Sequence, residues 1–166
     1  RNAGPRTVNV PGEVREEFNL AMVAINNAEY EKAEEILSGV ISQSQQTPVP
    51  QINIGMVRTK LGKLEEAEDA FNAALALDPG NPVASNELGL LYRKMGKFEE
   101  ARQVYETVLR KYPRYPDANK NLGILCDLYL RDYACAFNVY KAYSAAVPDD
   151  DSAKIWIVDV QRRAGL

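Results

Sequence analysis

The chain has 166 residues, of which 46% are hydrophobic and 26% charged, a composition typical of a single globular domain. Its net charge of −3 argues against nucleic-acid binding, which usually needs a basic face. The absence of histidine from the sequence excludes histidine-based acid–base catalysis and histidine-ligated zinc. No apolar run of the sequence reaches the roughly 18 residues of a membrane-spanning helix.

The first predicted element is an irregular N-terminal tail over residues 1–13. It has neither the apolar segment of a signal peptide nor an initiating methionine. We therefore interpret it as the edge of a shortened or processed chain, and we expect any targeting signal to lie upstream.

From residue 14 onward, residues of the same kind recur 34 positions apart. This holds for Gly55, Gly89 and Gly123, for Gly62 and Gly96, for Ala67 and Ala101, for Phe71 and Tyr105, and for Pro79 and Pro113. A fixed spacing near this length is typical of helical solenoids. The predicted repeats are 14–47, 48–81, 82–115 and 116–150, and the last one carries one extra residue near "DLYLRD" because Ala136 lies 35 residues after Ala101.

The repeated residues fit two antiparallel helices joined by a tight turn. Gly62 and Gly96 fall where the first helix must end with a positive φ. Glycine also recurs in the middle of the first helix, where it costs about 1 kcal/mol relative to alanine, so we expect a close helix approach there. The opposing surface is predicted to come from Ala67, Ala101 and Ala136, while Phe71, Tyr105 and Tyr140 fill the gap to the next repeat.

These residues resemble the tetratricopeptide repeat family over roughly residues 14–150. The features that match are, in the best copy, Leu88, Gly89, Tyr92, Gly96, Ala101, Tyr105 and Pro113. The resemblance implies an all-α fold, a right-handed αα-superhelix of helix-turn-helix repeats. Such a solenoid needs a terminal cap.

The last predicted element is a capping helix over residues 151–166. We expect Asp151 or Ser152 to cap its N-terminus. Its apolar surface is predicted to come from Ile155, Trp156, Ile157 and Val158. Trp156 is interpreted as a packing residue and not as a ligand contact.

In such an array the first helix of each pair lines an inner groove. The residues predicted to point into the groove, and therefore to contact a partner, are Phe18, Met22, Ile25, Ile52, Met56, Thr59, Asn86, Leu90, Arg93, Lys120 and Ile124, followed by Asp127. Apolar residues dominate the first two repeats, which suits a partner helix or an extended apolar peptide. The alternative is that Phe18, Met22 and Met56 cover one another or the N-terminal tail.

The resemblance also tests one specific partner. Chaperone-binding members of the family hold a C-terminal carboxylate with lysine and asparagine at positions that here carry Phe18 and Met22. Asn53 matches the next position, but Val83 and Glu87 replace the basic residues that should follow. We therefore do not expect an acidic chaperone tail as the ligand.

Other groups in the sequence give no sign of catalysis, of a metal site or of a cofactor. Adjacent carboxylates such as Glu65 and Glu66 stand at helix starts, where acidic residues complement the helix dipole. Cys126 and Cys135 are the only cysteines. Reduced, buried thiols are the favoured interpretation, and a disulfide is the alternative, which would indicate an oxidising compartment.

We therefore predict a non-enzymatic scaffold that binds a protein or peptide partner. The short, degenerate array with its acidic cap resembles bacterial envelope members of the family that help to assemble pili, secretion or transport machinery. This favours the periplasm or envelope over the cytoplasm. The alternatives are a self-associating structural module and an accessory domain of a larger protein.

Overall fold

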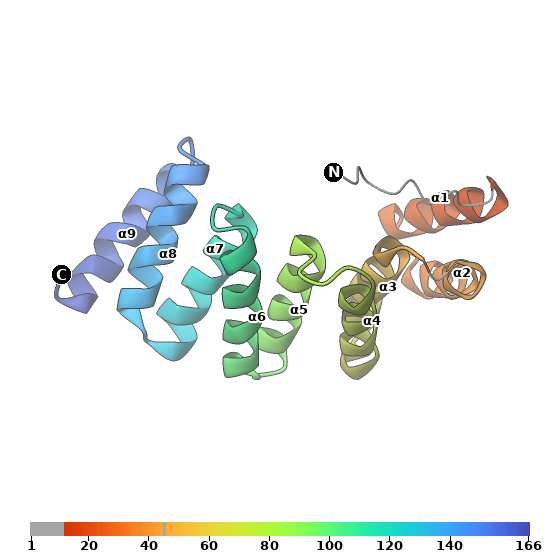
Figure 1. Cartoon of the computed structure of the whole chain (residues 1–166), viewed down its shortest axis with the longest axis horizontal. Coiled ribbons are helices and arrows are strands. Elements are labelled where there is room, and N and C mark those ends of the chain that lie inside the picture. The colour runs from red at the N-terminus through yellow and green to blue at the C-terminus, as the bar shows by residue number, and fades with distance from the viewer. Residues whose placement is uncertain (1–11, 45) are drawn as a thin grey trace, which may run out of the picture. The chain divides into compact units, whose positions relative to one another are not determined.

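The computed structural model describes residues 12–44 and 46–166, and within these residues it contains helices and no strand (Figure 1). The helices of the first half are α1 (Gly12–Asn26), α2 (Tyr30–Gln43), α3 (Pro48–Lys60) and α4 (Leu64–Leu77). Those of the second half are α5 (Pro82–Lys94), α6 (Phe98–Lys111), α7 (Pro116–Ile124), the π-helix η1 (Leu125–Leu130), α8 (Tyr133–Ala146) and α9 (Asp151–Ala164). The predicted tail lies outside the described residues, except that Gly12 and Glu13 already belong to α1.

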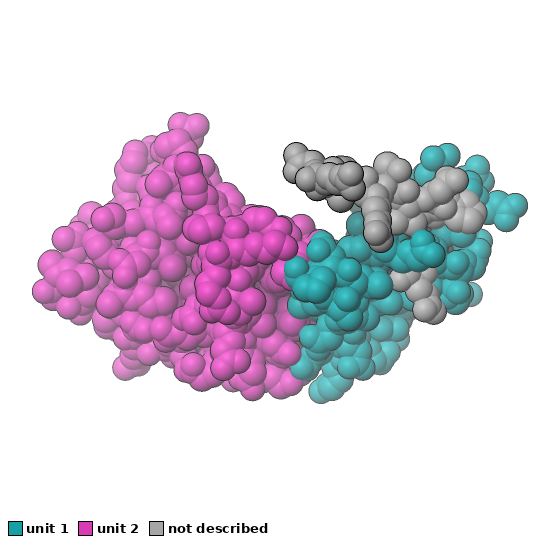
Figure 2. All heavy atoms as spheres, in the orientation of Figure 1, with its two compact units in different colours: residues 1–79 teal, residues 80–166 magenta. Residues whose placement is uncertain are grey.

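The chain divides into two compact units, Arg1–Pro79 and Gly80–Leu166 (Figure 2). Within each unit, successive helices pack against one another. The first unit has a buried cluster of Ala21, Ala24, Ala33, Leu37, Ile54, Val57 and Ala70. The second has a cluster of Ala101, Tyr105, Val108, Ala118, Leu122, Leu125, Cys126, Ala136, Tyr140 and Val160. Each unit therefore has a hydrophobic core of its own.

The turns inside the helix pairs share one backbone conformation. Gly62 and Gly96 have φ values of 78° and 76°, as the sequence predicted. Ala28 and Arg131 stand at the equivalent positions of the first and fourth repeats and adopt φ values of 58° and 53°. The turn is thus kept where glycine is missing, although a left-handed residue with a side chain costs about 1–2 kcal/mol.

The glycines in the middle of the first helices lie against aromatic rings. A Cβ atom added to Gly55 would lie 2.6 Å from a ring carbon of Phe71. Gly89 faces the ring of Tyr105 in the same way, because a Cβ atom added to Gly89 would lie within 3.0 Å of three carbon atoms of that ring. The close approach was predicted, but the assignment of the opposing surface to alanines was wrong. The ring belongs to the second helix of the same pair, where it is buried.

The extra residue of the fourth repeat is absorbed in η1. The N–H of Lys97, after the first helix of the third repeat, donates to the carbonyl of Tyr92, five residues back, at 2.8 Å. In the fourth repeat the N–H of Asp132 donates to the carbonyl of Cys126, six residues back, also at 2.8 Å. A π-turn holds one more residue than an α-turn. The helix therefore ends in the same type of turn despite the insertion.

Cys126 and Cys135 form a disulfide between η1 and α8, with their Cα atoms 6.0 Å apart. The favoured prediction of reduced cysteines was therefore wrong. The sequence placed the two residues on the two helices of one pair, but a bridge depends on the distance and direction of the two side chains, which spacing alone does not give. Cys126 is fully buried, and Cys135 is partly exposed.

The predicted capping helix over residues 151–166 corresponds to α9 (Asp151–Ala164), but its N-cap is neither Asp151 nor Ser152. Asp150 is the cap, and its carboxylate accepts a hydrogen bond from the N–H of Ser152 at 3.0 Å. The same carboxylate accepts a hydrogen bond from the Tyr143 hydroxyl at 2.7 Å. Asp150 is favoured because its side chain reaches both the open end of α9 and the side of α8, which ties these two helices together.

Trp156 packs inside the second unit, as predicted. Its ring lies 5.4 Å from the ring of Tyr140 and 6.1 Å from that of Tyr143, measured between centroids. Ile155 and Val158 do not share this surface, because their side chains are 70% and 67% exposed. The prediction that all four apolar residues of α9 cover the array was therefore wrong for these two.

Candidate functional site

The predicted groove residues of α1 lie partly over the core of the first unit. Phe18, Met22 and Ile25 are half-buried and pack against the cluster that contains Leu37 and Ile54. They offer only their outer edges to a partner. A role in covering the core accounts for much of their apolar surface.

On α3 the predicted residues differ strongly in exposure. Ile52 is buried, and the Thr59 hydroxyl donates to the carbonyl of Gly55 at 2.9 Å. Met56 is the open member of this set, with 40% of its surface exposed. A long, unbranched thioether side chain adapts to many apolar partners. Met56 is therefore the most exposed of the predicted groove residues on α3.

In the second unit the predicted residues of α5 and α7 form a polar and apolar strip. The Asn121 side-chain amide donates to the Asn86 side-chain oxygen at 2.9 Å, which links the two helices and leaves Asn86 buried. Leu90 and Ile124 are half-buried, and Ile124 packs against the core cluster. The amide pair therefore links α5 to α7 within the second unit.

Two cations of the strip lie over aromatic rings. The Arg93 guanidinium lies 5.9 Å from the ring centroid of Tyr129, and the Lys120 ammonium lies 5.4 Å from that of Tyr143 and 5.5 Å from that of Trp156. One terminal nitrogen of Arg93 is buried without a hydrogen-bond partner among the described residues.

Asp127 lies at the end of the strip but is almost fully buried. One of its oxygens is 2.9 Å from the guanidinium of Arg163 on α9, and the other accepts a hydrogen bond of 3.4 Å from the Tyr140 hydroxyl. Burial and the neighbouring Asp127 raise the pKa of Tyr140, so the phenol stays protonated. Asp127 thus ties η1 to α8 and α9 and does not face a ligand.

Sequence reasoning missed two exposed apolar residues beside this strip. Leu128 and Tyr129 on η1 are 64% and 48% exposed. The Tyr129 ring also contacts the ring of Phe98, with centroids 4.9 Å apart. Strict 34-residue spacing gives no guide here, because the inserted residue shifts the positions that follow it. The missing turn glycine after "DLYL" was the available signal.

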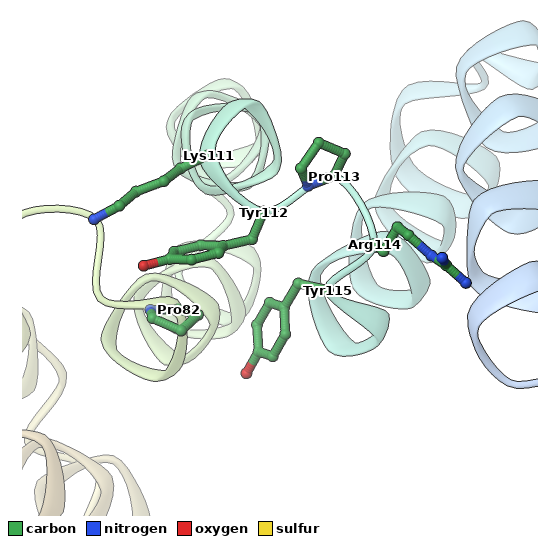
Figure 3. Close-up of a pocket in the computed structure, with 6 residues that line it drawn as sticks. All are labelled: Pro82, Lys111, Tyr112, Pro113, Arg114 and Tyr115. Atoms are coloured by element: carbon green, nitrogen blue, oxygen red, sulfur yellow. The ribbon is translucent and has the colours of Figure 1, made fainter.

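A second missed feature is a shallow apolar hollow of about 450 Å³ between α5, α6 and α7. Its lining residues are Pro82, Lys111, Tyr112, Pro113, Arg114 and Tyr115. Figure 3 shows the two tyrosine rings on the side of Pro82, with Arg114 directed away. Burial, and after it the nearby Asp117, raise the pKa of Tyr115 to about 12. The sequence signal was "KYPRYP", two Tyr-Pro pairs in succession.

Within residues 12–44 and 46–166, no cluster of three acidic or cysteine side chains could hold a metal ion. None of the helices in the same residues is long and apolar enough to cross a membrane.

Two family models described as tetratricopeptide repeat match the sequence, one over residues 18–82 and the other over residues 58–124. Together they cover residues 18–124, which include most of the first predicted repeat, all of the second and third, and part of the fourth. The chain belongs to the tetratricopeptide repeat family. Tetratricopeptide repeat arrays are generally non-catalytic, and this membership implies a scaffold for protein–protein interaction.

Solved structures share the tetratricopeptide repeat fold of this chain. MamA from Desulfovibrio magneticus RS-1 is 19% identical with a TM-score of 0.78, over 93% of this chain and 86% of that one. The pilF protein of Pseudomonas aeruginosa is 19% identical with a TM-score of 0.79, over 92% and 69%. A tetratricopeptide repeat protein from Parabacteroides merdae is also 19% identical, with a TM-score of 0.76, over 95% and 61%. No curated protein matches the sequence closely enough to be counted as related.

Proposed function

We propose that this tetratricopeptide repeat protein binds an apolar peptide or helix on the first helices of its repeats. The observation that carries the proposal is Met56, an exposed methionine among half-buried apolar residues on the predicted binding face. Exposed apolar groups of this kind commonly mark interaction surfaces. The strip in the second unit adds hydrogen-bonding groups, through Asn121 and Arg93, that could fix the position of a bound backbone.

The test is capture of partners from a native lysate by the immobilised chain, comparing wild type with Met56→Glu. A charge at this position should remove specific partners by introducing an unpaired carboxylate into an apolar contact. Leu77→Glu is the matched control, because Leu77 is 43% exposed, lies in the same unit and stands on a second helix. Unchanged capture by Met56→Glu, or equal loss with Leu77→Glu, would refute this binding face.

A finer proposal concerns the place of action, an assembly role in the bacterial envelope. It rests on the resemblance of the short array with its acidic cap to envelope members of the family, and on the disulfide between Cys126 and Cys135. Disulfides persist in oxidising compartments and are rare in the cytosol. Maleimide labelling of the protein from its native host should modify the cysteines only after reduction; labelling without reductant would contradict the proposal.

A further inference from the structure

The outward face of α9 carries an apolar patch that nothing in the described chain covers. Ile155 and Val158, one turn apart, are its two most exposed hydrophobic residues. They lie in a shallow hollow of about 510 Å³ whose remaining lining residues are Lys154, Asp159 and Arg162. Packing within the array does not explain this patch, because α9 contacts α8 through its other side, where Ala153 and Val160 are fully buried.

The position of Val158 shows which kind of neighbour the patch suits. Val158 stands 35 residues after Gly123, the glycine of α7 that faces the ring of Tyr140 on α8. In the pair of α7 and α8, the antiparallel helix α8 packs on the face of α7 that carries Gly123. On α9 the same face is open, and valine in place of glycine keeps a neighbouring helix at the ordinary 8–10 Å interaxial distance.

The charges around the patch are self-complementary. Consider two α9 helices packed antiparallel about a two-fold axis between residues 156 and 157. In this arrangement the numbers of two facing residues always add up to 313. Ile155 therefore contacts Val158 of the second copy. Lys154 meets Asp159 of the second copy, and Asp151 meets Arg162. All three pairs are favourable, and each occurs twice because the contact is symmetric.

A parallel arrangement would not have this property. It would place Lys154 opposite Lys154 and Asp159 opposite Asp159, and like charges opposite each other are unfavourable. Within one chain, Lys154 already pairs with Asp151, and Arg162 with Asp159, three residues apart. The charges therefore add modest affinity, but they select one direction and one register.

We propose that a second copy of this chain covers the α9 face, forming an antiparallel helix pair and a closed two-fold dimer. The helix has 14 residues and is about 21 Å long, so the buried area lies below the roughly 800 Å² per partner of a standard interface. The dimer should therefore dissociate on dilution. This inference is independent of the proposed partner-binding face, because it is tested by mass and not by capture.

The first experiment measures molar mass by sedimentation equilibrium from micromolar to millimolar chain concentration. The mass should rise from the 18.5 kDa of one chain toward twice that value, and Ile155→Glu should hold it at one chain throughout. Leu20→Glu is the control, because Leu20 is also an exposed apolar residue, 59% exposed, and lies on α1. Helical circular dichroism should be unchanged in both variants, since neither side chain is buried.

A complementation experiment tests the direction of packing. Mixing Ile155→Glu with Val158→Lys should restore a heterodimer, because the antiparallel pair brings the two substituted positions together with opposite charges. Mixing Ile155→Glu with Ile155→Lys should restore nothing.

Four results would overturn the proposal. They are a wild type that stays at one chain at every concentration, association that survives Ile155→Glu, rescue by the Ile155→Glu and Ile155→Lys mixture, and open-ended growth that Leu20→Glu abolishes. The last result would show head-to-tail stacking of array ends in place of a closed dimer.

Discussion

At the scale of single residues, the contact between a first-helix glycine and an aromatic ring sets the spacing of each helix pair. The Tyr105 ring lies where a side chain on Gly89 would project, and Tyr105 itself is fully buried. Burial is the main cause of its raised pKa, so its hydroxyl stays protonated. The ring cannot move aside without disturbing the core around it.

Gly89→Ala should therefore lower the free energy of unfolding by about 1–3 kcal/mol, because overpacking outweighs the gain in helix propensity. The matched control is Gly39→Ala in α2, where an added Cβ meets no atom within 4 Å. That substitution should raise the free energy of unfolding by up to about 1 kcal/mol. Urea unfolding followed by circular dichroism measures both, and two changes of the same sign would contradict the close-contact explanation.

At the scale of helices, an ion-pair network links α2, α3 and the turn before α4. The Glu34 carboxylate accepts hydrogen bonds from the Lys63 ammonium at 2.6 Å and from the Arg58 guanidinium at 3.0 Å. The hydrogen bond from Lys63 is the largest of the influences that lower the pKa of Glu34 from its ordinary value of 4.5. The Glu34 side chain is 15% exposed, which limits screening by solvent.

This network should make stability depend on pH. A carboxylate whose pKa is lowered by folding contributes its full stabilisation above pH 4.5, and this contribution is lost as the pH falls through the lower, folded-state pKa. Glu34→Gln should therefore flatten the loss of stability in urea below pH 4.5 relative to wild type. The control is Glu35→Gln at the exposed neighbouring position. If the free energy of unfolding fell equally with decreasing pH in wild type and in Glu34→Gln, the prediction would be contradicted.

The elements themselves were largely readable from the sequence, because turn glycines and mid-helix glycines recur with the period of the fold. The predictions that failed concern the burial of single side chains, which depends on the neighbour that each side chain faces. Asn86 was placed in the groove, but it is buried against Asn121, and Ile155 was expected to pack, yet it is 70% exposed. Periodicity gives the side of a helix on which a residue lies but not the occupant of the space beyond it.

At the scale of the whole molecule, the two units have separate cores, and the disulfide lies in the second. Its loop spans nine residues in sequence, so reduction should lower the stability of that unit by about 2–3 kcal/mol. Hydrogen exchange should then accelerate in α7, η1, α8 and α9 and stay unchanged in α1–α4. A Cys126→Ser, Cys135→Ser double variant should show no response to reductant. Equal acceleration in both units would show that they unfold together.

The π-helix η1 bears on how arrays of this kind are recognised. One residue added to an α-helix rotates everything after it by about 100°. Because η1 closes the addition within one wide turn, Ala136 and Tyr140 are buried as Ala101 and Tyr105 are. The second family match ends at residue 124, directly before η1 begins. A sequence search that assumes a constant spacing between repeats would therefore end its match at such a turn, although the helices after the turn still pack as a repeat.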